Sequence, residues 1–259
     1  MINGKSDELA LAIDSHIRSL ITERDDWQFA HVSDCFGCDR STWERRQRTT
    51  APTNERDGKS CLKMALGNDV ERYVCDGLQT FYEAKGYATE RDYRVIWDPH
   101  NGRGSYTWAR EEIMPLPNYI VGHADFHAWH PNGESILLEC KSTSFFRGKA
   151  PTEPSLHYVE QAATYAIAVG ATHAGIIIAC RESGRIAGPF WLDLDALEFA
   201  TIERAKAVIA NTSPENMIPP AAFPRYSWQP KYCKMGSECA CLAAANADKT
   251  AHQLEASLK

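Results

Sequence analysis

The chain has 259 residues, of which 44% are hydrophobic and 24% charged, and its formal net charge is −6 at pH 7. That length is enough for one large domain or two small ones, and the composition is ordinary for a globular protein. The acidic balance argues against indiscriminate coating of nucleic acid, although a local basic groove is enough to track phosphates. No apolar run nears the roughly 20 residues of a membrane span, and acids interrupt the first apolar stretch, so we expect a cytoplasmic protein with no membrane contact and no signal peptide.

The first sixty residues predict two helices and a loop. Residues 7–24 place Leu and Ile at helical spacing behind a capping serine, Ser6. Residues 31–48 read HVSDCFGCDRSTWERRQR, a CxxC pair followed by a basic helix. The arginines of that helix, beginning with Arg40, form either a solvated face or contacts to phosphate. Residues 49–58 are polar and contain Pro and Gly, which indicates a loop.

A long helix is predicted over residues 60–85, because apolar residues recur on one of its faces. The stripe consists of Leu62, Leu66, Val70, Val74, Leu78 and Phe81. Glu71 lies beside this stripe, half turned towards the core. We then expect a strand over 87–97, a turn over 99–104 and irregular structure as far as residue 118.

Residues 119–141, YIVGHADFHAWHPNGESILLECK, predict two strands joined by a tight turn at Asn132-Gly133. Strand side chains alternate between faces, so every second residue points the same way. One face of the first strand is predicted to hold His123, Asp125 and His127. One face of the second is predicted to hold Ser135, Leu137, Glu139 and Lys141, and the other Ile136, Leu138 and Cys140. His123 and His127 are four residues apart, which on a strand is a separation of roughly 13 Å. This distance argues against a zinc ion shared by these two histidines.

The second half of the chain continues to alternate helices and strands. A basic loop with Arg147 and Lys149 precedes a helix over residues 155–169, on which Gln161 and Tyr165 share a face. The remaining predictions are strands over 172–180 and 186–192 and helices over 193–210 and 241–257. The fold class is therefore predicted to be α/β, with a mixed central sheet flanked by helices and a core over residues 59–210.

The two strands of 119–141 bring together groups that suit phosphodiester hydrolysis. That reaction needs an activated water and neutralised charge on the phosphate, which one or two divalent ions can supply. Asp125 and Glu139 offer the oxygen ligands that suit Mg²⁺ or Mn²⁺, and the carbonyl of Cys140 is a further candidate ligand. Lys141 is predicted to orient the water or to stabilise developing charge. The alternative is an ordinary salt bridge between Glu139 and Lys141 at a sheet edge.

Asp125 followed by Glu139-Cys140-Lys141 resembles the D…(D/E)xK motif of the PD-(D/E)XK nuclease superfamily, with Ala124 where the family has proline. The GHAD of residues 122–125 and the QxxxY of residues 161–165 resemble its RecB-like branch. The resemblance implies a restriction-endonuclease-like core. It also implies that Gln161 and Tyr165 contact DNA or shape the active site.

Residues 67–71, GNDVE, fall where that branch carries a GxxxH motif. Glu71 thus stands in place of a metal-binding histidine, and the resemblance implies that Glu71 is a ligand of the metal or of the water. The catalytic set implied in this way is Glu71, Asp125, Glu139 and Lys141. The implied metal ligands are Glu71, Asp125, Glu139 and Cys140.

Nine cysteines are many for a cytoplasmic chain, in which clustered cysteines indicate metal binding before disulfides. The single cysteines are expected to be buried, as free cysteines commonly are. These are Cys61, Cys75, Cys140 and Cys180. The others form two groups, Cys35 with Cys38 near one end and Cys233, Cys239 and Cys241 near the other.

The two groups resemble the cysteines of the CRISPR-associated four-cysteine exonucleases, which hold an iron–sulfur cluster. Cys38-Asp39-Arg40 is similar to their upstream motif, with aspartate in place of proline, and Cys233-x5-Cys239 is similar to their last two cysteines. Pro230 stands where a further cysteine is expected, so Cys35 or Cys241 would complete the set. Four thiolates suit either a [4Fe–4S] cluster or a structural Zn²⁺ ion.

These features together predict a metal-dependent DNA nuclease. We expect an exonuclease acting on single-stranded DNA or duplex ends, in recombination, repair, or the DNA processing of phages or CRISPR systems, with a recombination, helicase or integrase-type protein as a possible kind of partner. Phosphates would be held by Arg40, Arg147 and Lys149, and the cysteine cluster would join helical segments 1–58 and 211–259. The rival is a non-catalytic DNA-binding adaptor, against which the intact carboxylates and lysine speak. Cleavage polarity and oligomeric state stay open.

Overall fold

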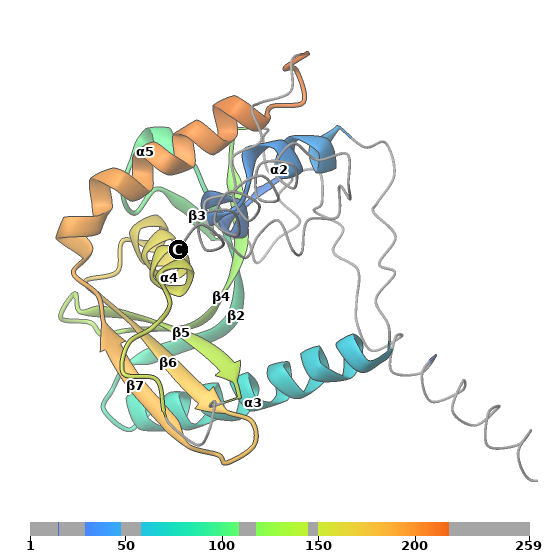
Figure 1. Cartoon of the computed structure of the whole chain (residues 1–259). Coiled ribbons are helices and arrows are strands. Elements are labelled where there is room, and N and C mark those ends of the chain that lie inside the picture. Colours follow the sequence, from blue (N-terminus) through green and yellow to red (C-terminus); the bar gives the residue numbers. More distant parts are fainter. Residues whose placement is uncertain (1–14, 16–28, 48–57, 109–117, 145–149, 218–259) are drawn as a thin grey trace, which may run out of the picture.

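The computed structural model describes residue 15 and residues 29–47, 58–108, 118–144 and 150–217 (Figure 1). Its strands form one sheet in the order β3-β2-β4-β5-β6-β7, with β1 paired to β4. They are β1 Ala30–His31, β2 Ala88–Trp97, β3 Tyr106–Trp108, β4 Ile120–Trp129, β5 Ser135–Thr143, β6 His173–Cys180 and β7 Ile186–Trp191. The β1–β4 and β5–β6 pairs are parallel and the others antiparallel, so the sheet is mixed.

Helices lie on both faces of this sheet (Figure 1). They are α2 Asp39–Arg46, α3 Gly58–Glu83, α4 Leu156–Val169 and α5 Leu194–Thr212, with short 3-10 helices η1 Val32–Phe36 and η2 Pro99–Asn101. One face is covered by α3 and the other by α4, on which α5 packs as an outer layer. The predicted fold class, a mixed sheet flanked by helices, is confirmed. No helix within the described residues is long and apolar enough to cross a membrane.

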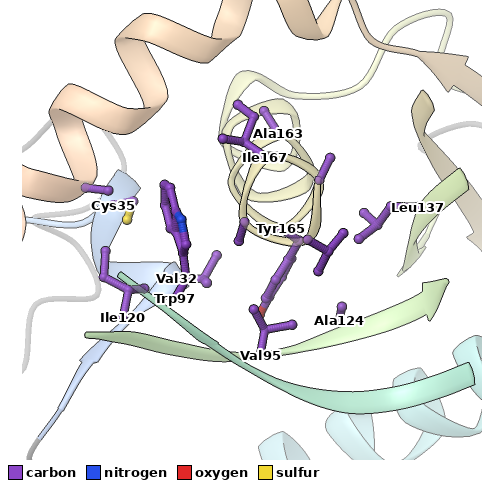
Figure 2. Packing of buried hydrophobic residues seen from close by; sticks show 14 of the residues in the cluster. Val32, Cys35, Val95, Trp97, Ile120, Ala124, Leu137, Ala163, Tyr165 and Ile167 are labelled. Atoms are coloured by element: carbon purple, nitrogen blue, oxygen red, sulfur yellow. The ribbon is translucent and has the colours of Figure 1, made fainter. Parts of the chain in front are cut away.

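Each face of the sheet carries an apolar core. The larger core lies between the sheet and α4, where Trp97, Ile120 and Ile167 meet with almost no exposure (Figure 2). The second lies between the sheet and α3 and includes Phe126 and Leu138. Burying side chains of this size provides the main favourable free energy of folding, about 1.5–3 kcal/mol for each.

The stripe predicted for α3 is only partly right. Its middle packs on the sheet as expected, but Leu62 and Leu66 are exposed, because the N-terminal half of α3 runs past the sheet (Figure 1). Near the other end Tyr82 is buried and Phe81 exposed, so the inward face is one residue out of the predicted phase. The prediction that single cysteines are buried is confirmed for Cys75, Cys140 and Cys180. The side chain of Cys61 lies outside the described residues.

The strand β4 turns over at Asp125. Ala124 belongs to the core against α4, whereas Phe126, two residues on, belongs to the core against α3. Strict alternation would place both on one face. In the pairing with β2, the change falls between the pairs Tyr93–Ala124 and Arg91–Phe126. The residue of β2 between these pairs is Asp92, whose φ is +44°. A break in the regular strand therefore lies at Asp92 and Asp125 together.

The prediction that His123, Asp125 and His127 share one face is consequently wrong for His127. Its ring stacks on Tyr93 with the ring centroids 5.7 Å apart, and its Nε2 lies 2.6 Å from the Oγ of Ser135. It is buried in the core on the α4 side, beyond the point where the strand turns over.

Burial lowers the pKa of His127 to about 4. In the unfolded chain this histidine has a pKa near 6.5, so between about pH 6.5 and pH 4 it takes up a proton that the folded chain does not. The free energy of unfolding therefore falls progressively over this range as the pH is lowered. We expect the advantage of the wild type over His127→Gln in free energy of unfolding to shrink by up to about 3 kcal/mol between pH 7 and pH 4. Urea unfolding at several pH values measures it, and a pH-independent difference would contradict it.

The segment 29–47 is attached to α5 through the buried side chain of Arg46. Arg46 is 3% exposed and donates to Thr212 Oγ1 of α5 at 2.8 Å, while Arg45 is paired with Asp34 at 2.5 Å. Arg46 is therefore neither part of a solvated face nor a phosphate contact, the two alternatives predicted from sequence, while Arg45 is half-buried. Arg40 remains partly exposed and is paired with Glu44.

Candidate active site

The candidate site lies at a gap in one edge of β4. On one side β4 pairs with β2 along its length except at Asp125. On its other side β1 pairs with Ile120 and Val121, and β5 pairs only from Phe126 onwards. Side chains bond to the backbone between these pairs: the amide of His123 donates to the Tyr165 hydroxyl at 3.1 Å. Among the described residues, no strand pairs with this edge of β4 between Val121 and Phe126.

A pocket of about 820 Å³ opens at this gap. Five predicted site residues line it, namely Glu71, Asp125, Lys141, Gln161 and Tyr165. They come from α3, β4, β5 and α4, so the fold brings together residues that are distant in sequence. His31 and Ser33, just before and within η1, form part of another wall.

Asp125 and Lys141 are held in place by short contacts. One carboxylate oxygen of Asp125, Oδ2, accepts from the amide of Cys140 at 2.8 Å and lies 3.6 Å from Lys141 Nζ. The same ammonium contacts Glu139 Oε1. Glu139 is fully buried, and its second oxygen, Oε2, has no hydrogen-bond partner within the described part of the chain. An unpartnered buried carboxylate oxygen is costly, which marks this position as suited to a cation.

The third carboxylate, Glu71, approaches from α3. Its Oε1 accepts from the amide of Ser142 at 3.2 Å. Gly67, one turn earlier, allows this approach, because a Cβ there would lie 2.8 Å from the Oγ of Ser142. Gly122 has a similar role on β4, where a Cβ would lie 2.7 Å from the hydroxyl of Tyr165. Both motif glycines thus serve close packing around the site.

Burial and mutual repulsion perturb these groups. Burial raises the pKa of Glu139 to about 8, with Asp125 adding to the rise and Lys141 opposing it. Burial also raises the pKa of Glu71. For Lys141 burial alone would lower the pKa, but the neighbouring Glu139 and Asp125 raise it above its usual range. Lys141 thus contacts two carboxylates, with Glu71 as a third nearby, and the raised pKa values of Glu71 and Glu139 indicate that a cation among these groups would be stabilised.

As the side chains lie, no three His, Cys, Asp or Glu residues among those described converge closely enough to hold a metal ion. The ammonium of Lys141 bridges Asp125 and Glu139 instead. The chemistry of the donor set nevertheless fits a hard divalent ion: carboxylates are present, and one buried oxygen of Glu139 lacks a partner.

Tyr165 and Gln161 differ in what they can reach. Tyr165 is 4% exposed and holds the backbone of β4, so of its two implied roles the shaping of the site fits its position. Gln161 is half-buried and lines the pocket. Arg147 and Lys149 lie outside the described residues.

The cysteine cluster stays a prediction. Cys233, Cys239 and Cys241 lie outside the described residues. Cys35 is 3% exposed in the core against α4, and Cys38 is the partly exposed N-cap residue of α2. The backbone carbonyl of Cys140 likewise stays a predicted ligand, while its thiol lies 3.6 Å from the thiol of Cys75.

Sequence analysis did not assign Arg72, Arg91 or Asp92 to the site, although all three line the pocket. Arg72 directly follows Glu71, which is a usable signal. Nothing in the sequence connects Arg91 to the site, because only the pairing of β2 with β4 brings it there.

Asp92 is a strained residue at the mouth of the pocket. It is the one non-glycine residue with positive φ within the described part of the chain, and its carboxylate lies 3.4 Å from His123 Nδ1. We expect Asp92→Val to lower the free energy of unfolding by about 2 kcal/mol, because a β-branched residue tolerates this backbone poorly. Asp92→Gly and Asp92→Asn should remain close to wild type. Urea unfolding of the three variants tests this, and equal losses in all three would contradict it.

No family model and no curated protein matches this chain. Among solved structures, the protein SSO0001 is 18% identical and aligns with a TM-score of 0.48 over 93% of this chain and 98% of its own. The alkaline exonuclease LHK-Exo from Laribacter hongkongensis is 15% identical and aligns with a TM-score of 0.46 over 73% of this chain and 90% of its own. The roles of the residues therefore rest on the geometry of this chain.

Proposed function

We propose that the chain is a metal-dependent deoxyribonuclease of the PD-(D/E)XK type. The observation that carries the proposal is the buried cluster in which Lys141 contacts Glu139 and Asp125, beside the unpartnered Oε2 of Glu139. Glu71, Asp125 and Lys141 line the pocket, and Glu139 lies against Lys141. A polymer can therefore reach these groups from the pocket, as its hydrolysis requires. A merely structural salt bridge would not need three carboxylates around one lysine.

The residues have distinct roles in this proposal. Glu71, Asp125 and Glu139 would hold Mg²⁺ or Mn²⁺, with the carbonyl of Cys140 as a further ligand. A divalent ion bound there neutralises charge on the phosphate and makes water a better nucleophile. Lys141 would orient the attacking water and stabilise the charge that develops on the phosphate. Tyr165 ties β4 to α4 by accepting a hydrogen bond from the amide of His123, and Gln161 would contact the DNA strand.

The finer assignment is an exonuclease of the RecB-like branch that acts on single strands or duplex ends. A [4Fe–4S] cluster, or Zn²⁺, bound by Cys35 or Cys241 with Cys38, Cys233 and Cys239 belongs to this assignment. It is supported by the QxxxY and GHAD motifs around the pocket and by the cysteine pattern. An absorbance spectrum of anaerobically purified protein, with metal analysis, tests the cluster.

The experiment that tests the function is digestion of end-labelled single- and double-stranded DNA with Mg²⁺ or Mn²⁺. We expect degradation that EDTA stops and that the Asp125→Asn variant lacks. A ladder that shortens from one labelled end would identify exonuclease action and its polarity. Undegraded DNA with either ion, in protein whose fold is intact by circular dichroism, would overturn the proposal.

A further inference from the structure

Two arginines stand on the α3 side of the pocket. Arg72 projects from α3 one residue after Glu71, and Arg91 projects from β2, one residue before the strained Asp92. Both line the same pocket as Asp125 and Lys141. Side-chain exposures of 61% for Arg72 and 38% for Arg91 leave both guanidinium groups open to a ligand.

Each of these arginines is paired with an aspartate of α3. Arg72 contacts Asp69 at 3.0 Å, and Arg91 contacts Asp76. Exposed pairs of this kind contribute little to stability, typically below about 1 kcal/mol. A guanidinium carries five N–H donors, and one carboxylate engages only part of them. The aspartates therefore orient the guanidinium groups and leave donors for another anion.

The charge of the pocket points to the same conclusion. Four carboxylates line the pocket, those of Asp69, Glu71, Asp92 and Asp125, against the ammonium of Lys141. Without Arg72 and Arg91 this lining would stay net negative, and would repel a polyanionic strand, even with one divalent ion bound. Cations beside the carboxylates are thus needed for binding, and Arg72 and Arg91 are the arginines that line this pocket among the described residues.

We propose that Arg72 and Arg91 form a clamp on two backbone phosphates of the substrate strand, with Asp69 and Asp76 as intramolecular competitors for the same guanidinium groups. The clamp rests on the proposed function, since it positions the strand for that site. It places the strand across the α3–β2 side of the pocket. Arginine suits this role because its planar fork matches phosphate oxygens.

If the aspartates compete with DNA for the guanidinium groups, arginine and aspartate variants should change the affinity for DNA in opposite directions. Binding of a fluorescein-labelled 30-nucleotide oligo(dT) to the full chain is measured by anisotropy in Ca²⁺, across a salt series. Arg72→Gln and Arg91→Gln are each expected to raise Kd roughly tenfold and to reduce the slope of log Kd against log salt by about 0.7. Asp69→Asn and Asp76→Asn are expected to lower Kd, roughly threefold, by removing a competitor.

The pair Glu203 and Lys206 on α5 provides the matched control, because like Asp69 and Arg72 it is a surface pair three residues apart on a helix. Glu203→Gln and Lys206→Gln should change Kd less than twofold. In cleavage assays the arginine variants should raise KM and leave kcat within about threefold, because the clamp positions the strand and does not touch the reacting atoms.

The outcomes separate the clamp from the function. Wild-type protein that neither binds nor cleaves DNA overturns the proposed function and the clamp with it. Wild-type protein that cleaves, with Arg72→Gln and Arg91→Gln behaving like the α5 controls, overturns the clamp alone. Arginine and aspartate variants that both weaken binding, with lowered melting temperatures, would show the pairs to be structural and likewise overturn the clamp.

Discussion

Replacing Lys141 by alanine is expected to slow DNA cleavage by about 10³-fold, because the ammonium is the cation placed against both Asp125 and Glu139. The rate of release of labelled nucleotide in Mg²⁺ at saturating DNA measures the loss. Lys206→Ala, on the exposed surface of α5, is the control and should retain wild-type activity. A Lys141→Ala protein that cleaves at the wild-type rate would exclude this lysine from the catalytic machinery.

The same variant distinguishes a metal site from a salt bridge. In the structure the ammonium occupies the space between carboxylates to which a divalent ion would bind, so its removal leaves Glu139 and Asp125 without their counter-charge. We therefore expect Lys141→Ala to bind Mn²⁺ severalfold more tightly than the wild type, measured by calorimetry, while it loses activity. If the carboxylates serve only the salt bridge, the variant would gain no affinity for Mn²⁺ and would only lose stability.

Replacing Arg204 by methionine is expected to cost about 4 kcal/mol of unfolding free energy. The guanidinium of Arg204, on α5, donates to the carbonyl of Cys35 at 2.8 Å, to that of Gly37 at 3.2 Å and to the carboxylate of Asp39 at 2.6 Å. Methionine keeps the apolar stem but leaves these acceptors without their donor. Urea unfolding measures the change.

The control for this prediction is Arg40→Met, which removes an arginine of the segment 29–47 to which Arg204 donates. Arg40 is paired with Glu44 one turn away at the surface, so its loss should cost less than about 1 kcal/mol. Equal losses in both variants would mean that Arg204 does not hold the segment 29–47 in place.

The parts of the site that follow from local chemistry could be predicted from the sequence. Asp125, Glu139 and Lys141 were placed together because a tight turn and strand alternation fix their spacing, and the alternation holds throughout β5. Glu71 was identified through the resemblance of residues 67–71 to the GxxxH motif, whereas the reason for Gly67, its close approach to Ser142, needed the structure.

The errors come from tertiary effects that sequence periodicity does not contain. His127 was misplaced because β4 turns over beside Asp92, where an aspartate takes a backbone conformation more often taken by glycine. Arg46 was read as a surface residue, yet it is buried against Thr212. Burial lowers its pKa to about 10, which still leaves the guanidinium charged at neutral pH.

Because of the gap in the edge of β4, the two walls of the site are attached to the sheet in different ways. One wall belongs to β4 and β5, which are tied into a continuous ladder, whereas the wall at His31 is attached to β4 by the pairs Ala30–Ile120 and His31–Val121. Ala30 and Val32 are nonetheless buried in the core against α4, and Arg45 donates to the carbonyl of Phe29, so this wall is held mainly by side chains. The position of one wall is thus set by the backbone ladder, and that of the other by the packing of the core.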